Sequence, residues 1–185
     1  ASIFSLIVTS IFYLIKMNPD FQQMIDDCKN ELNDIELRLQ TLSATDPCRK
    51  YLTNYSLIKA CGTAEFVYRS IIADYFKKYA SPQIDTYLEN TIRNASSSAK
   101  YDNMKNLLDK FDKAWCDAFK AAVDSHIDGI THIKDGQRLI SSSNSLVTNR
   151  HNFAHGKNPT AGFCDIKKYF YDVVTLIELL DNSVK

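Results

Sequence analysis

The sequence predicts an all-α protein, built as an up-and-down bundle of four long helices with shorter additional helices. Glycine and proline are scarce, with five and four copies among 185 residues, so few positions interrupt a regular helix. Apolar residues recur at three- and four-residue steps over several long segments, which is the period of a helix face and not of a strand. A chain of this length can also form one domain with its own hydrophobic core.

The first two long helices carry clear signals in the sequence. Asn18 is expected to cap a helix that has Pro19 at its first position, because Asn accepts a hydrogen bond from the free N–H groups and Pro has none to satisfy. This helix is predicted to extend to Leu42, with one apolar seam: Phe21, Ile25, Cys28, Leu32, Ile35, Leu39 and Leu42. A second helix is predicted over 47–80. Since it is apolar on two faces, it is expected to be the central, most buried helix.

Four further helical segments follow. A shorter helix is predicted over 81–94, and the polar segment 95–100 after it is expected to be a flexible break. One amphipathic helix, ending near Ser125, is predicted from a single stripe: Met104, Leu107, Leu108, Phe111, Trp115 and Phe119. The next helix is predicted from Leu139 to Gly156. The last one has a seam formed by Phe163, Ile166, Phe170, Val173, Val174, Ile177 and Leu180.

The single helical domain is predicted to span residues 17–185, after an apolar leader or extension at residues 1–16. Residues 1–15 are uncharged, but they are short for a membrane span, which needs about 20 residues. They also lack the basic start and the clear cleavage site of a signal peptide. The role of the leader stays open between an upstream extension, an anchor remnant that associates with a membrane, and a helix packed on the bundle.

Charge and cysteine content exclude several classes of protein. The chain has 22 basic and 22 acidic residues, which excludes a broad basic surface that coats nucleic acid, so any RNA contact must be local. The five cysteines are odd in number and include no C-x2-C pair. Neither a disulfide framework nor a zinc site is indicated, and a reducing, cytoplasmic compartment is expected.

A metal site has to be weighed around Gly129, where acidic and histidine residues cluster: Asp124, His126, Asp128 and His132. Their spacing matches neither a pair of histidines on one helix face nor a known metal-binding loop. We therefore interpret this segment as a solvated turn and predict neither a metal nor a cofactor.

The segment 146–156, LVTNRHNFAHG, contains the main functional candidates, Arg150 and His155. An arginine can counter the charge of a phosphate and a histidine can move a proton, so the pair is sufficient for cutting RNA without a metal ion. The spacing alone is common. On spacing alone, the preferred explanation is structural: an arginine with a buried partner and a histidine at a helix end. Gly156 is expected to end the helix in a left-handed conformation.

The spacing between Arg150 and His155 raises a geometric question. Five residues of ideal helix rotate the side-chain direction by about 140° and rise about 7.5 Å, so the two side chains would not share a face of one straight helix. Either the helix breaks before His155, or one residue works with its counterpart from a second copy of the chain.

The stretch from Leu146 to Val184 resembles the C-terminal half of a HEPN domain of the RiboL-PSP or MAE type. The features that carry the resemblance are the R-x4-H motif, RHNFAH, and the later helix CDIKKYFYDVVTLIELLDNSV. The resemblance implies a small helical bundle in which two motifs, one from each protomer of a homodimer, form a metal-independent endoribonuclease site. Arg150 and His155 would then be catalytic. RNA would be the substrate, and such proteins are often toxins or antiphage effectors with an antitoxin or other partner protein.

Five more residues are candidates for auxiliary roles. The family commonly has Asn directly after the motif arginine, where this chain has His151, and Asn149 and Asn152 lie close by in the sequence. Glu65 matches an acidic residue that HEPN domains of this type often carry, and its spacing from Arg69 is compatible with an ion pair within one helix. The alternative function is a non-catalytic HEPN-like module that dimerises or binds RNA without cutting it.

Overall fold

The computed structural model describes residues 17–77 and 80–184, and within these ranges the chain is helical, with no strand. The predicted leader lies outside the described residues. The helices are α2 (Pro19–Thr41), α3 (Cys48–Lys77), α4 (Pro82–Leu88), the short π-helix η1 (Glu89–Arg93), α5 (Tyr101–Phe111), α6 (Lys113–Ser125), α7 (Gly136–Ala154) and α8 (Phe163–Ser183). The prediction of an all-α bundle with four long helices, α2, α3, α7 and α8, is confirmed.

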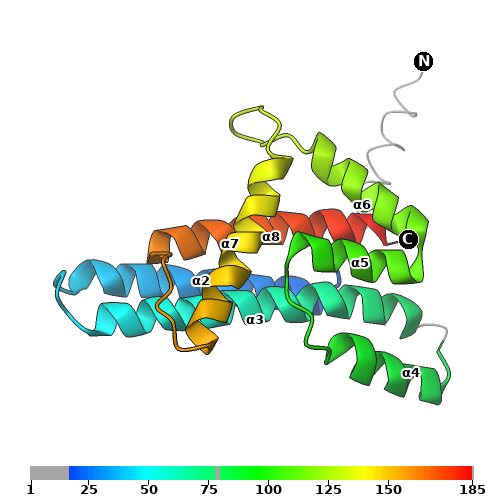
Figure 1. The fold of residues 1–185 in the computed structure, drawn as a ribbon, viewed down its shortest axis with the longest axis horizontal. Helices are drawn as coiled ribbons and strands as arrows, with labels where there is room; N and C mark the ends of the chain where they lie inside the picture. The colour runs from blue at the N-terminus through cyan, green and yellow to red at the C-terminus, as the bar shows by residue number, and fades with distance from the viewer. Residues whose placement is uncertain (1–16, 78–79, 185) are drawn as a thin grey trace.

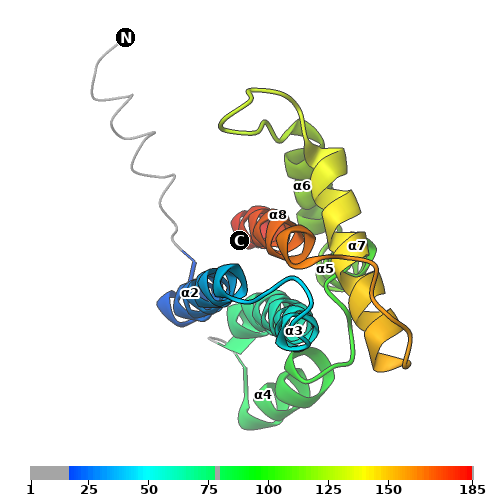
Figure 2. The same ribbon diagram turned by 90° about the vertical axis from the view of Figure 1, so that its left-hand side faces the viewer.

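Three long helices lie side by side and the fourth crosses them. Figure 1 shows α2, α3 and α8 along the long axis of the molecule, with α7 running steeply across them. α7 packs on both α8 and α3, and Figure 2 shows its C-terminal part leaving the bundle beside α3. The motif segment therefore lies on a helix that spans two layers and ends at the surface.

α3 is the central helix, as its sequence predicts. It packs against α2, α8 and α7, and its buried residues include Leu57, Ala60, Cys61, Ala64 and Val67. α8 adds further core residues, among them Ile166, Phe170, Val173 and Ile177. The seam of α2 covers the opposite side of α3. The apolar periodicity thus identifies the faces that form the core.

The N-terminal signals of α2 are confirmed. The side chain of Asn18 accepts a hydrogen bond from the N–H of Asp20 at 3.0 Å, and Pro19 is the first helical residue. At the other end, the guanidinium of Arg49 donates to the carbonyls of Leu39 at 2.5 Å and Leu42 at 3.2 Å. These bonds satisfy carbonyls that have no partner within the helix, and they join the end of α2 to the start of α3.

The prediction of one helix ending near Ser125 is wrong, because the chain breaks at Asp112 into α5 and α6. Asp112 has an extended backbone, and its carboxylate accepts a hydrogen bond from the N–H of Ala114 at 2.7 Å. An aspartate at this position favours a helix start over a helix interior. The apolar stripe continues across the break since Phe111, Trp115 and Phe119 all face the same core.

α7 begins at Gly136, three residues before the predicted Leu139. A Cβ atom at Gly136 would lie 2.1 Å from the carbonyl oxygen of Val123 in α6. Glycine therefore permits the close approach of the two helices here. In the described part of the chain, no helix has the length and apolar character needed to cross a membrane.

Candidate active site

Arg150 lies on the face of α7 that is directed at α3. Leu146 and Val147, one turn earlier, are buried and fix this face against the core. The Nη2 atom of Arg150 donates to the Oε1 atom of Glu65 at 2.5 Å. The arginine side chain is 33% exposed and the glutamate side chain 13%. The guanidinium is thus held from inside the protein while part of it still faces solvent.

The surroundings of Arg150 keep it charged. Burial by itself would lower the pKa of Arg150, but its hydrogen bond with the Glu65 carboxylate and the charge of Glu65 help to outweigh burial and raise it. Burial, followed by the charge of Glu65, raises the pKa of the Cys61 thiol to about 12. Cys61 therefore stays a neutral thiol, and its Sγ lies 3.5 Å from the Glu65 carboxylate. Arg150 can offer a fixed positive charge to an anion at the surface.

The spacing of Glu65 and Arg69 does not lead to an ion pair. Arg69 Nε donates to the backbone carbonyl of Glu65 at 2.8 Å, while the Glu65 carboxylate reaches across to Arg150. The partner of the Glu65 carboxylate is thus the motif arginine. The Arg69 side chain therefore binds the backbone of its own helix, α3.

His155 caps the C-terminus of α7. Gly156 has a φ of 73°, which confirms the expected left-handed residue. The N–H of Gly156 donates to the carbonyl of Phe153 at 3.1 Å, and the N–H of Lys157 donates to the carbonyl of Asn152 at 2.8 Å. This pair of bonds is the Schellman arrangement that ends a helix.

The helix does not break before His155. Helical structure continues through Ala154, and the His155 ring lies beside the ring of His151, one turn back, with centroids 4.2 Å apart. Both histidines are exposed. His155 therefore points along the His151 side of α7, whereas Arg150 faces Glu65 on α3. One copy of the chain does not bring the two motif residues together on one helix face.

Asn149 and Asn152 differ in their roles. The side-chain oxygen of buried Asn149 accepts hydrogen bonds from the N–H groups of Thr160 at 2.8 Å and Ala161 at 3.0 Å, and its amide donates to the carbonyl of Ser145. Asn149 thus holds the α7–α8 connection in place and is a structural residue. Asn152 is partly buried and contributes its carbonyl to the helix end.

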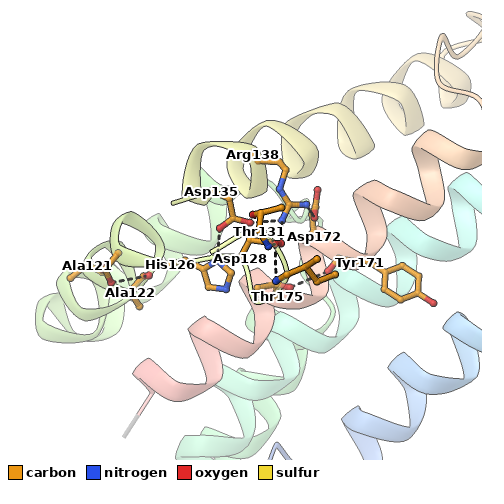
Figure 3. A network of polar contacts seen from close by, with 12 residues as sticks. Ala121, Ala122, His126, Asp128, Thr131, Asp135, Arg138, Tyr171, Asp172 and Thr175 are labelled. Atoms are coloured by element: carbon orange, nitrogen blue, oxygen red, sulfur yellow. Dashed lines mark hydrogen bonds and ion pairs between the residues drawn. The ribbon is translucent and has the colours of Figure 1, made fainter. Parts of the chain in front are cut away.

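Two of the residues around Gly129, His126 and Asp128, belong to a polar network with Asp135, Arg138 and Asp172 (Figure 3). Arg138 on α7 contacts Asp135, Asp128 and, on α8, Asp172. His126 Nδ1 lies 2.6 Å from Asp135 Oδ1. Throughout residues 17–77 and 80–184, no group of three or more His, Cys, Asp or Glu side chains is placed to hold a metal ion. These carboxylates stabilise the α6–α7 connection.

Sequence reasoning missed Cys61 as a neighbour of the site. Cys61 and Glu65 are four residues apart on α3, so they lie on one helix face. The spacing of Cys61 and Glu65 indicates that Cys61 is near the site only when Glu65 is known to contact Arg150. Glu65 and Arg150 are 85 residues apart in the chain, so the sequence does not show that contact.

Comparison with known proteins identifies the domain family. The family model RiboL-PSP-HEPN matches residues 23–185, which includes all the helices except the first turn of α2. Searches of curated proteins and of solved structures found no match. HEPN domains are often ribonucleases, so the match points to a nuclease or RNA-related function. Because this match covers most of the chain, the chain belongs to the RiboL-PSP-HEPN family.

Proposed function

We propose that the protein is a metal-independent endoribonuclease of the HEPN type, acting as a toxin or as an effector of antiphage defence. The observation that carries this proposal is the Glu65–Arg150 pair, which holds a charged guanidinium at the surface end of α7, close in sequence to the exposed imidazole of His155. A fixed cation and a mobile proton carrier are the two groups that RNA cleavage by its own 2′-hydroxyl requires.

In the proposed reaction, the 2′-hydroxyl oxygen attacks the adjacent phosphorus and the bond to the 5′-oxygen breaks. A His155 imidazole takes the proton from the 2′-hydroxyl, and an imidazolium gives a proton to the departing 5′-oxygen. The products are a 2′,3′-cyclic phosphate and a 5′-hydroxyl. Arg150 counters the negative charge that develops on the phosphoryl oxygens. Glu65 is a positioning residue, since it acts through the guanidinium.

We propose that the active form is a homodimer. Because Arg150 and His155 face different sides of α7, a composite site would combine residues of two copies around a two-fold axis near Arg150. The end of α7 offers a contact surface: Phe153 is 37% exposed, and Ala154 is exposed beside it.

The metal-free mechanism predicts cleavage of total RNA in excess EDTA, with 2′,3′-cyclic phosphate at the new 3′ ends. Arg150 supplies the charge that a metal ion would otherwise provide. The measurement is end analysis of RNA incubated with the purified protein, using Arg150→Ala protein as the control. Activity that disappears on chelation and returns with magnesium would contradict the mechanism. RNA binding without cleavage would favour the non-catalytic module.

The composite site predicts that Phe153→Asp separates the protomers and lowers cleavage in parallel. A carboxylate at this half-exposed position would have to be desolvated on association, which opposes dimer formation. Sedimentation and specific activity should be measured over the same dilution series. Tyr87→Asp is a matched control, since Tyr87 is exposed on α4, and Figure 1 shows the helix α4 apart from α7. A demonstrated monomer with full specific activity would rule out the composite site.

A further inference from the structure

A pocket of about 320 Å³ lies between the start of α3 and the connection from α7 to α8. The first turns of α3 contribute Arg49, Lys50, Thr53 and Asn54, and the connection contributes Asn158. None of the residues that line the pocket is acidic. The carboxylate of Asp46, just before α3, accepts a hydrogen bond from the N–H of Cys48 and so caps the helix. The pocket combines positive charge with amide and hydroxyl groups, which are the groups that bind phosphate oxygens in nucleic-acid complexes.

The pocket is joined to the motif helix through Asn149. This residue, directly before Arg150, binds the N–H groups of Thr160 and Ala161 and thereby holds the wall that carries Asn158. On the other side, Lys50 Nζ lies 3.4 Å from Asn158 Oδ1. The helix that presents the motif and the pocket wall therefore form one connected unit.

The pocket is also close to His155 along the chain. Asn158 is three residues after His155, so their Cα atoms are separated by at most about 11 Å. An RNA strand with its scissile phosphate at His155 can thus place a neighbouring phosphate in the pocket. The protein as a whole has no net charge, so local contacts of this kind must supply the electrostatic part of RNA affinity.

We propose that this pocket binds a phosphate of the RNA strand next to the scissile one, with Lys50 as its main cation. The inference rests on the proposed ribonuclease function for the identity of the ligand. Arg49 is tied to the end of α2 by its bonds to the carbonyls of Leu39 and Leu42. Lys50 is exposed, and its 3.4 Å hydrogen bond goes to Asn158, another residue of the pocket, so a phosphate can take the place of that contact and Lys50 is the residue to change.

The test measures binding separately from cleavage. A short fluorescent RNA with 2′-O-methyl groups at every ribose has no nucleophile and is not cut, and its binding can be followed by anisotropy across a salt series. Lys50→Ala should weaken binding roughly 3- to 10-fold and reduce the slope of log affinity against log salt by about 0.7, the value for one phosphate contact on a single strand. Asn54→Asp, which places a carboxylate in the pocket, should weaken binding at least as much.

The control is Lys113→Ala. Lys113 is 76% exposed at the start of α6. Figure 1 shows α6 toward the opposite end of the molecule from the start of α3, where the pocket lies. The substitution Lys113→Ala removes one positive charge, as Lys50→Ala does, and should change neither the affinity for RNA nor the slope of log affinity against log salt. Inorganic phosphate should compete with RNA for binding to the wild-type protein, and it should compete less well for binding to Lys50→Ala. This comparison distinguishes a phosphate-binding subsite from a contact with the RNA bases.

The outcomes separate the two proposals. If Lys50→Ala and Asn54→Asp bind RNA as the wild type does while the wild type cleaves RNA, the pocket proposal is overturned and the nuclease stands. If binding depends on Lys50 but no RNA is cleaved, the pocket is an RNA site and the proposed catalysis fails. If the wild type cleaves RNA and Lys50→Ala raises KM with kcat unchanged, the pocket is a subsite of the enzyme.

Discussion

Replacing His155 by Ala is expected to lower the rate of RNA cleavage by roughly 10²- to 10⁴-fold, the usual loss when a general acid or base is removed. The structure makes this a clean substitution. His155 is exposed at the C-cap of α7, and the bonds that end the helix come from the backbones of Gly156 and Lys157. The helical circular-dichroism spectrum and the thermal midpoint should therefore stay close to those of the wild type.

His151→Ala is the matched control for this substitution. His151 is also exposed, lies on the same helix end, and has its ring 4.2 Å from that of His155. Losing this neighbour should change the rate by less than about 10-fold, because in the proposed mechanism His155, and not His151, transfers the proton. Should His151→Ala prove as damaging as expected for His155 while His155→Ala is mild, the assignment of the proton carrier is wrong.

Arg150→Ala is a less direct test of catalysis. It removes the cation from the site and also leaves the largely buried carboxylate of Glu65 without its partner. A loss of activity would then combine a missing charge with reduced stability. Glu65→Gln tests the role of the Glu65 charge more directly. The glutamine amide oxygen can still accept a hydrogen bond from Arg150, while the negative charge of the carboxylate is removed.

Local sequence patterns were sufficient to predict most of the fold. The caps at Asn18 and Gly156 and the apolar seams depend on residues within one or two turns, and the structure confirms them. The break at Asp112 was missed because the apolar stripe is the same on both sides of it. The early start of α7 at Gly136 depends on a contact with Val123 in another helix, which periodicity does not report.

The site was predicted only in part for the same reason. The motif residues lie five positions apart, so their common helix and the helix end could be read locally. The partner of Arg150 is Glu65, a residue brought near by the packing of α7 on α3. The local spacing favoured a pair with Arg69 instead, since periodicity reports neighbours on one helix and not contacts between helices.

The second large effect is expected at Arg138, where Arg138→Met should lower the free energy of unfolding by about 3 kcal/mol. Arg138 contacts Asp172 and Asp135, whose side chains are only 6% and 9% exposed. Removing the cation takes from Asp172 its ion-pair partner and leaves Asp135 with His126 alone. Breaking a buried ion pair on one side costs about 3–5 kcal/mol. We expect the lower end because the Arg138 side chain is 38% exposed and screened by water.

Unfolding in denaturant at neutral pH measures this effect, and Asp172→Asn supplies the control. The double substitution Arg138→Met with Asp172→Asn should be more stable than Arg138→Met alone, because the buried charge is gone and Ser142, now 2.6 Å from Asp172, can still donate to the amide oxygen. A loss below about 1 kcal/mol in the single variant would show that the network contributes little to stability.

The same network predicts how stability depends on acid. Burial alone would raise the pKa of Asp135, but its contacts with His126 and Arg138 outweigh burial and lower it. A carboxyl whose folded pKa lies below its unfolded value stabilises the protein above the unfolded value, about 3.9, and this contribution is lost as the pH falls through the folded pKa. The wild type should therefore lose stability below about pH 4.

Because Arg138→Met removes one cause of the lowered pKa of Asp135, the difference in stability between the wild type and this variant should shrink over the same acid range. Equal differences at pH 7 and pH 3 would show that Arg138 stabilises the fold through packing and not through its charge.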